Sequence, residues 1–415
     1  ALQEKILSEL GPVFDSHEHF GHDGNYKFQD PTLSIRQIFN HAYLYLENKS
    51  VSDEELIYLA ERYKGSARLH SLRQGLQDLY DIDIYPLSVE KLKVLDEKVK
   101  LARVDQEPVF NIMFHKGNVS NIILDIQPDY WHIWKHPQIK HTLRIDEVIC
   151  PFVKQINNTY KIVKKPHQLQ YFANTRGLSI ETLDEFDDVL EQYAASLRQM
   201  ICAIKIGSAY QRPLNFEVEE NDDGKISEIW KKIQEGNVIS NKEAMRWGNY
   251  VVTFLLSYAM YEKLPVQVHT GLATMQGTNP ASLLPVMEAF SAVTFDLFHG
   301  GYPFHHEVAG VLDKRFNARI NLCWMPILSI AATKYLMREI IDIGYSDRII
   351  AYGGDCQSPE GSYGALLLTK DMIADVLASY IQDNRLILGD AIDLANNLLY
   401  NNAIRVYDEF GGKKR

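Results

Sequence analysis

Short apolar runs rich in β-branched residues alternate with amphipathic stretches through the second half of the chain. The apolar runs predict five β-strands, namely Ile201–Ile206, Val266–His269, Val293–His299, Ala318–Trp324 and Arg348–Asp355. The 3.6-residue spacing of apolar positions predicts helices over Lys242–Lys263, Ser282–Phe290, His306–Arg315, Ser329–Ile343 and Ala365–Ile381. Strand and helix in regular alternation are typical of a parallel sheet covered by helices.

Three earlier apolar runs bring the predicted strands to eight; they are Val13–His19, Ile122–Ile126 and Arg144–Cys150. Eight such strands favour a closed (β/α)8 TIM barrel. The first two are about a hundred residues apart, whereas ordinary connections have roughly 2–6 residues. The gap therefore predicts a helical insertion after the first strand, with helices over Pro31–Asn48, Asp53–Lys64 and Val89–Val104. We assign residues 1–20 and 111–415 to the barrel and residues 21–110 to this insertion, which we expect to form a cap.

Composition and charge narrow the class of protein. With 46% hydrophobic and 23% charged residues, the chain of 415 residues has ample material for a folded core. Its net charge of −11 and the lack of a long basic run argue against nucleic acid as a partner. No apolar stretch reaches the ~18 residues of a membrane span, and the N-terminus does not resemble a secretion signal. We therefore expect a cytoplasmic protein.

The first predicted strand ends in the sequence His17-Glu18-His19. Because strand side chains alternate with a period of two, both imidazoles point to the same side. In a barrel, inward residues at the C-terminal ends of strands form the active site, so both rings are expected at the barrel mouth. His-x-His also arises by chance, and the pair gains weight only from its position.

Three further predicted strands end in residues of the kind that bind metals. They end in His269, His299 and Asp355, whereas a strand normally gives way to Gly, Asn or Ser where a turn begins. Metal binding would give these unrelated strands a common reason for such an ending. Imidazole and carboxylate ligands without thiolate suit Zn²⁺, Mn²⁺ or Fe²⁺.

Residues at and after the end of the fourth predicted strand are candidates for substrate contact. Lys205 could bind a substrate carboxylate, could bridge two metals in a carbamylated form, or could be an ordinary lysine that reaches solvent. Tyr210 and Arg212 lie in the loop expected to overhang the pocket. Arg212 could bind a substrate carboxylate in bidentate fashion, and the alternative is a solvated surface arginine.

The order of these motifs resembles the amidohydrolase superfamily of metal-dependent barrels. Closer similarity to its amidohydrolase-related branch lies in Pro265-Val266-Gln267-Val268-His269-Thr270-Gly271, Phe298-His299-Gly300-Gly301-Tyr302-Pro303-Phe304 and Tyr352-Gly353-Gly354-Asp355. That branch includes the amidohydrolase part of glutamine-synthetase-like fusion proteins, and it is distantly similar to uronate isomerases and metal-dependent decarboxylases. The resemblance covers Met200–Tyr407, with Asp15–His19 as a separate anchor.

This resemblance implies a ligand set and an activity. His17, His19, His269 and Asp355 are the implied ligands of one divalent ion, with zinc favoured over manganese or iron. A second ion is possible if Lys205 is carboxylated. Family members differ on whether the positions of Lys205 and His299 bind a second metal or the substrate. We expect a hydrolase of an amide, ester or lactone bond in a small, anionic molecule. It would use metal-activated water, with Asp355 as the proton shuttle and His299 or Lys205 stabilising charge on the substrate oxygen.

Two other functions fit the same residues. The first is a metal-dependent decarboxylase or an enzyme similar to uronate isomerases, because one barrel hosts many chemistries. The second is a binding module without catalysis, against which the intact ligand set argues. Family habit implies a homo-oligomer that acts on a small-molecule substrate.

Overall fold

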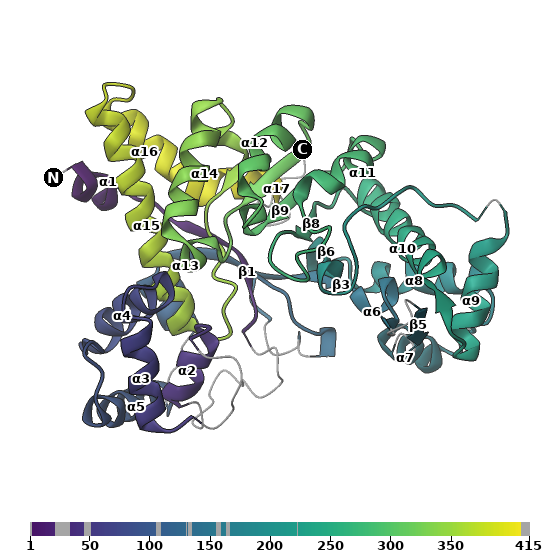
Figure 1. Cartoon of the computed structure of the whole chain (residues 1–415), viewed down its shortest axis with the longest axis horizontal. Coiled ribbons are helices and arrows are strands. Elements are labelled where there is room, and N and C mark those ends of the chain that lie inside the picture. The colour runs from purple at the N-terminus through teal and green to yellow at the C-terminus, as the bar shows by residue number, and fades with distance from the viewer. Residues whose placement is uncertain are drawn as a thin grey trace. The chain divides into compact units, whose positions relative to one another are not determined.

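The chain folds around one parallel β-sheet. The computed structural model describes residues 2–20, 34–44, 51–104, 109–129, 131, 135–154, 159–162, 167–221 and 223–407 (Figure 1). Within these residues an eight-stranded sheet has the order β1-β2-β3-β6-β8-β9-β10-β11. Its strands are β1 (Val13–Glu18), β2 (Val119–Leu124), β3 (Ile139–Arg144), β6 (Ile201–Ile206), β8 (Val266–His269), β9 (Phe295–Phe298), β10 (Ala318–Asn321) and β11 (Ile349–Ile350).

Backbone hydrogen bonds join the last strand to the first. The Ser16 N–H donates to the carbonyl of Tyr352 over 3.2 Å, and the Asp355 N–H donates to the carbonyl of His17 over 3.0 Å. These bonds link the segment that follows β11 to β1, so the sheet closes on itself. The predicted (β/α)8 TIM barrel with a helical insertion after its first strand is confirmed.

The strands are buried on both faces, which explains their nearly continuous apolar runs. Every residue of β6, β8 and β9 is buried, as in parallel sheets that are covered by helices. The predicted bounds of β6 and β8 agree with the structure. The third strand is a correction: we expected Arg144–Cys150, but β3 is Ile139–Arg144 and a short helix, α6 (Asp146–Ile149), follows it.

The chain divides into two compact units, which we call the terminal unit (Ala1–His141 and Asn321–Arg415) and the central unit (Thr142–Ile320). Each is described by itself. The helices of the terminal unit are α1 (Leu2–Ser8), α2 (Ile35–His41), α3 (Asp53–Arg62), α4 (Ala67–Tyr80), α5 (Val89–Val104), α13 (Met325–Leu328), α14 (Ile330–Asp342), α15 (Pro359–Gln382), α16 (Leu388–Asn396) and α17 (Asn402–Val406).

Helices α2 to α5 form the insertion between β1 and β2. Their apolar faces share one cluster of buried residues that runs from Ile35 to Val99. At the start of α3, Ser52 and Glu55 form a reciprocal capping box, as the Ser-x-x-Glu pattern predicts. Helix α4 was not among the expected helices. The boundaries that we assigned to this insertion, residues 21–110, stay a prediction.

Helix α4 packs closely against α15 (Figure 1). The two helices meet at Gly75 and Gly364. A Cβ atom on Gly75 would lie 2.9 Å from the Cα atom of Gly364, and one on Gly364 would lie 2.3 Å from the carbonyl oxygen of Ser71. Glycine at both positions therefore lets the two backbones approach each other.

The central unit contains strands of the barrel and a second, antiparallel sheet. That sheet has the order β4-β5-β7, with β4 (Phe152–Lys154), β5 (Thr159–Ile162) and β7 (Ile239–Ser240). The helices of this unit are α6, α7 (His167–Arg176), α8 (Leu183–Leu197), α9 (Lys225–Glu235), α10 (Asn241–Glu262), α11 (Leu284–Ala289) and α12 (Val308–Lys314). Helices α8, α9 and α10 pack together through three aromatic rings, those of Phe186, Trp230 and Trp247, whose centroids are 4.6 to 5.2 Å apart.

None of the helices in the described part of the chain combines the length and the apolar character needed to cross a membrane.

Candidate metal centre

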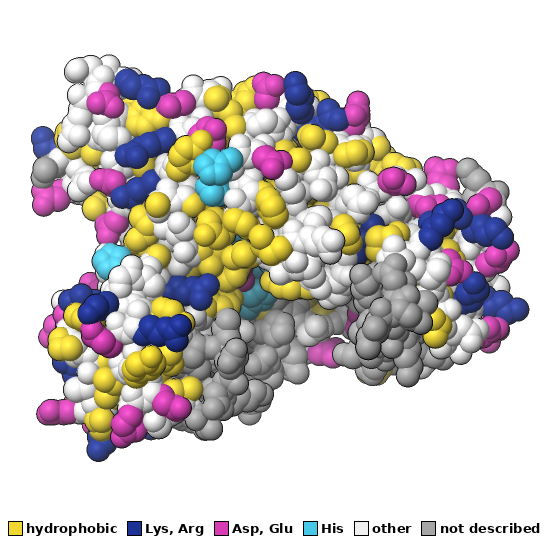
Figure 2. Space-filling model, viewed as in Figure 1, with side chains coloured by type: hydrophobic (Ala, Val, Ile, Leu, Met, Phe, Trp, Pro, Cys, Tyr) yellow, Lys and Arg dark blue, Asp and Glu magenta, His cyan; other side chains and the backbone are white. Residues whose placement is uncertain are grey.

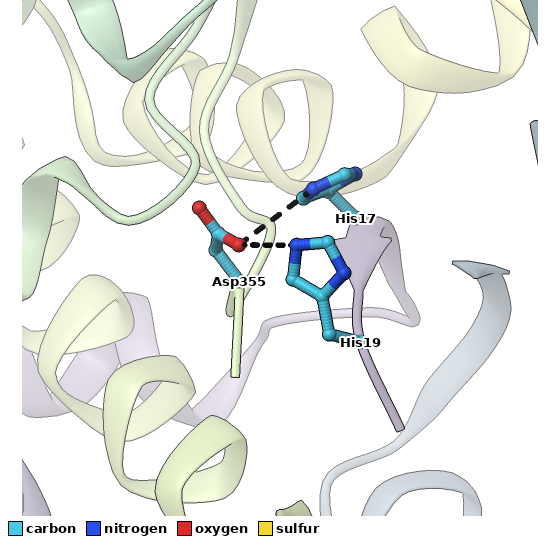
Figure 3. Close-up of side chains that lie close together, drawn as sticks. All are labelled: His17, His19 and Asp355. Atoms are coloured by element: carbon cyan, nitrogen blue, oxygen red, sulfur yellow. Dashed lines mark ion pairs between the residues drawn. The ribbon is translucent and has the colours of Figure 1, made fainter. Parts of the chain in front are cut away.

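Two histidines at the end of β1 and one aspartate after β11 lie together in the terminal unit. The Nε2 atom of His19 is 3.0 Å from Oδ1 of Asp355, and the Nε2 atom of His17 is 3.6 Å from the same oxygen. Figure 3 shows both rings directed at this carboxylate. His17 and Asp355 are buried, and His19 is partly buried.

The spacing and chemistry of these three side chains fit a divalent cation. Ligands about 2.1 Å from one ion lie roughly 3–4 Å apart at ordinary bond angles, and the described ligand atoms of this cluster all lie within 4.8 Å of one another. The His19 Nδ1–H donates to the carbonyl of Asp125 over 2.9 Å. This hydrogen bond directs the Nε2 lone pair of His19 at the carboxylate of Asp355. The lone pair and the carboxylate would repel each other unless a proton or a cation lies between them.

The backbone of Asp355 is held in a strained conformation. Its φ of 52° lies in the left-handed region, which costs a non-glycine residue about 1–2 kcal/mol. Its N–H donates to the carbonyl of His17, and its own carbonyl accepts a hydrogen bond of 2.8 Å from the Tyr43 hydroxyl. These contacts direct the side chain of Asp355 toward His17 and His19.

Two carboxyl groups, those of Asp15 and Glu18, lie on β1 beside the two histidines. Burial raises the pKa of Asp15 to about 7, and burial likewise raises the pKa of Glu18 well above its usual range. The charge of Asp15 further raises the pKa of Glu18, because two buried carboxylates close together repel each other. Glu18 also accepts hydrogen bonds from the Cys356 N–H and from the Ser362 hydroxyl. The pair therefore anchors the segment around Asp355 and adds less than two negative charges to the site.

Asp125 is a neighbour of this cluster that our sequence predictions missed. It follows β2, is buried, and places Oδ2 3.9 Å from Nε2 of His17. The signal was present, because the apolar run Ile122–Ile126 contains a carboxylate at the end of the strand, as the segment that ends in Asp355 does. Its main-chain carbonyl also fixes the ring of His19.

In the central unit, His269 and His299 form a second histidine pair. Nε2 of His299 lies 3.0 Å from Nδ1 of His269, and Nε2 of His269 lies 2.5 Å from the carbonyl of Leu272. Both ring nitrogens of His269 thus have a partner, so ligation of a metal would replace one of these contacts. The ring of Tyr210, which is half exposed, packs on His269 with centroids 4.6 Å apart.

Lys205 lies on β6 with its side chain buried. Its Nζ atom is 3.5 Å from the centroid of the Phe298 ring, a cation–π contact. Lys205 is 1% exposed, which excludes the alternative that it is an ordinary lysine that reaches solvent. Binding of a substrate carboxylate and carbamylation stay predictions.

Arg212 is buried and makes hydrogen bonds within the central unit. Its guanidinium donates to the carbonyls of Pro213 and Met245, each over 3.1 Å, and to the side chain of Asn249 over 2.8 Å. It also packs on the ring of Phe216. These contacts give Arg212 a structural role, and the solvated surface arginine that we considered is wrong. Its contact with a substrate stays a prediction.

Comparison with known proteins shows one curated relative and several similar structures. No protein-family model matches the chain. A segment of 149 residues is 27% identical to the protein fluG of Emericella nidulans; it spans 35% of this chain and 17% of that protein. The match thus covers a small part of the relative's length.

Solved structures match over nearly the whole chain. The uronate isomerase of Thermotoga maritima has a TM-score of 0.76 at 12% identity, covering 98% of this chain and 97% of its own. The glucuronate isomerase of Caulobacter crescentus also scores 0.76 at 12% identity, covering 100% and 95%. A protein of Lactobacillus casei described provisionally as a metal-dependent hydrolase scores 0.66 at 14% identity, covering 100% and 99%.

Identities of 12 to 14% show a shared fold. The chain therefore has a TIM-barrel fold, which these solved structures share. The candidate site at β1 and Asp355 lies where barrels of this kind carry their chemistry.

Proposed function

We propose that the protein is a metal-dependent enzyme of the amidohydrolase superfamily that hydrolyses an amide, ester or lactone bond in a small, anionic molecule. The observation that carries the proposal is the convergence of His17, His19 and Asp355 on one point. A carboxylate among neutral imidazoles, without thiolate, suits zinc and also manganese or iron.

A bound divalent cation supplies Lewis acidity, which acidifies water and polarises a substrate carbonyl. The groups of this chain then have separate tasks. Asp355 accepts the proton of the attacking water on one carboxylate oxygen and returns it to the leaving group. The main-chain carbonyl of Asp125 holds His19 in the tautomer whose Nε2 lone pair is directed at Asp355.

His269, His299 and Lys205 complete the proposed site by analogy with the superfamily. His269 ends the fifth strand of the barrel, and His299 follows the sixth. In a TIM barrel, residues at these strand ends face the active site. We propose His269 as the remaining ligand, which would give up its contact with His299 or with Leu272 to bind. Lys205 and His299 would stabilise the negative charge on the substrate.

A second candidate is isomerisation of a sugar acid or decarboxylation on the same metal. The two isomerases with TM-scores of 0.76 favour it, although a fold hosts many reactions. An isomerase must move a proton between neighbouring carbons, and the buried carboxylate of Asp125 beside His17 offers a second acid–base group.

The test combines metal analysis with substrate panels. Purified protein should contain about one divalent ion per chain by elemental analysis. The metal-loaded protein is then incubated with amides, esters and lactones of small acids, with uronates, and with carboxylic acids. Released amine, alcohol or opened lactone supports hydrolysis. Interconversion of uronates, or CO₂ without hydrolysis, would assign the second candidate, and failure to bind any divalent ion would refute both.

A further inference from the structure

In the described part of the helical insertion, a tyrosine contacts the proposed metal ligand Asp355. Tyr43 lies just after α2, and its hydroxyl donates a hydrogen bond of 2.8 Å to the main-chain carbonyl of Asp355. The tyrosine is itself fixed on two sides. Its ring packs on Trp324 with centroids 5.2 Å apart, and its carbonyl accepts a hydrogen bond of 2.9 Å from Arg68 of α4.

The bond from Tyr43 acts on a residue whose backbone is strained. Asp355 has a φ of 52°, and such a conformation persists only where its surroundings hold it. The N–H of Asp355 is fixed by the carbonyl of His17, and its carbonyl is fixed by Tyr43. Loss of the second bond would remove the contact on the carbonyl of the following peptide group, whose N–H would still donate to Glu18 over 2.8 Å. A small reorientation of this peptide group would then change the direction of the Asp355 side chain.

A second contact ties the same insertion to the chain just beyond Asp355. Glu360, in the first turn of α15, forms a buried ion pair of 2.5 Å with Arg103 of α5. It also accepts a hydrogen bond of 2.8 Å from the Tyr80 hydroxyl of α4. The segment from Asp355 to Glu360 is therefore held by the insertion at both ends.

We infer that Tyr43 is a positioning residue for Asp355 and that the helical insertion thereby sets the metal affinity of the site. This inference rests on the proposed function, because it assumes that Asp355 binds the ion. Tyr43 acts through the backbone of Asp355 and has no contact with the ion in this role. Outer partners of this kind typically change metal affinity by roughly 10–100-fold when they are removed.

The experiment compares Tyr43→Phe with Tyr58→Phe in the full chain. Tyr58 lies on α3 of the same insertion and is 66% exposed, so it is a matched control. Metal-free protein is titrated with Zn²⁺ in competition with a chelator, and with Co²⁺ while its visible absorption is recorded. We expect Tyr43→Phe to bind zinc about 10-fold more weakly and to show an altered Co²⁺ spectrum. Tyr58→Phe should match the wild type in both.

The thermal unfolding of the metal-free variants separates positioning from simple packing. A packing defect would lower stability without changing the Co²⁺ spectrum, which reports the arrangement of ligands. Equal zinc affinity and an unchanged spectrum in Tyr43→Phe would overturn the inference while wild-type metal binding still supports the proposed function. Failure of the wild type to bind metal would instead refute the proposed function.

Hydrogen exchange on the wild type provides a second measurement if Tyr43→Phe does not fold. Coupling between sites is reciprocal, so an ion bound through Asp355 must in turn stabilise the segment that holds it. We expect slower amide exchange in α2 and in residues 42–44 with zinc than with a chelator. Identical exchange in the two states would overturn the inference.

Discussion

Single residues at the ends of barrel strands hold unusual backbone conformations. His299, Trp324 and Asp355, which follow β9, β10 and β11, all have a positive φ. Such non-glycine residues cluster at functional sites, where the surrounding structure holds them. The sequence predicted His17, His19 and Asp355 because residue type and strand position are visible in it. It does not reveal the hydrogen bonds that hold Asp355, because Tyr43 is far away in sequence.

Substitution of the proposed ligands should separate binding from catalysis. His17→Ala removes one of the proposed metal ligands. We expect the metal content of this variant to fall at least 10-fold. Asp355→Asn keeps an oxygen ligand and loses the proton acceptor, so it should retain more metal than activity. Elemental analysis and turnover of an identified substrate measure the two effects. The exposed His306→Ala is the control, and a normal metal content in His17→Ala would exclude this ligand set.

The partly buried carboxyl group of Asp187 should make the free energy of unfolding depend on pH. Burial raises the pKa of Asp187 on α8 to about 6, although the Tyr250 hydroxyl donates a hydrogen bond to it. The folded chain therefore binds more protons than the unfolded chain between about pH 4 and pH 6, and stability falls as the pH rises through this window. Above pH 6 the loss is constant.

Asp187→Asn should remove this dependence, since the amide does not ionise. We expect it to gain about 1 kcal/mol at pH 7, after allowance for the partial exposure of the group. Urea unfolding at pH 4 and pH 7 measures the difference, and the exposed Asp383→Asn, whose charge is not among those that act on Asp187, serves as its control. A loss of stability at pH 7 equal to that at pH 4 would show that the hydrogen bond from Tyr250 outweighs the burial.

At the scale of elements, apolar runs located the strands that are buried on both faces. Strands β6 and β8 have such runs and were predicted with their observed bounds. Strand β3, with the sequence Ile-Lys-His-Thr-Leu-Arg, mixes polar and apolar residues, so the apolar segment after it was taken for the strand. The strands of the small second sheet were also missed, because their sequences, Phe-Val-Lys, Thr-Tyr-Lys-Ile and Ile-Ser, contain no continuous apolar run.

Helix α4 was missed although Leu69, Leu72 and Leu76 have helical spacing. Gly75 weakens the local helical signal, and the reason for a glycine there is a tertiary contact. The packing of α4 on α15 needs both Gly75 and Gly364, which lie far apart in the chain. Local patterns therefore predicted the insertion as helical without predicting which of its helices meets the barrel.

Two Gly→Ala substitutions, one inside the contact between α4 and α15 and one outside it, should have opposite effects on the free energy of unfolding. Gly364→Ala would place a methyl group 2.3 Å from the Ser71 carbonyl, and such overpacking should cost about 1–3 kcal/mol. Gly389→Ala, in α16, meets no atom within 4 Å and should gain a few tenths of a kcal/mol from helix propensity. Urea unfolding of both variants measures the contrast. Equal stability of the two would show that α4 and α15 can separate without cost.

At the scale of the whole molecule, the fold limits the function without determining it. The same barrel is found in isomerases and in a provisional hydrolase at 12 to 14% identity, and one fold supports many reactions. Under the proposed function, the reaction would depend on which side chains the strand ends bring to the ion. Those side chains belong to segments from both ends of the chain, so the ligand set is a property of the entire fold.

Metal-dependent stability can therefore test whether His269 belongs to that set. A ligand that binds only the folded state stabilises it, by about 2.7 kcal/mol at a concentration a hundredfold above its Kd. We expect zinc to stabilise the wild type by about this amount in urea unfolding, relative to protein with a chelator. His269→Ala should lose about 1.4 kcal/mol or more of that gain, since each tenfold drop in affinity removes this much. If His269→Ala keeps the full gain, the ion is bound by His17, His19 and Asp355 without His269, and the proposed ligand set has to be reduced to these three residues.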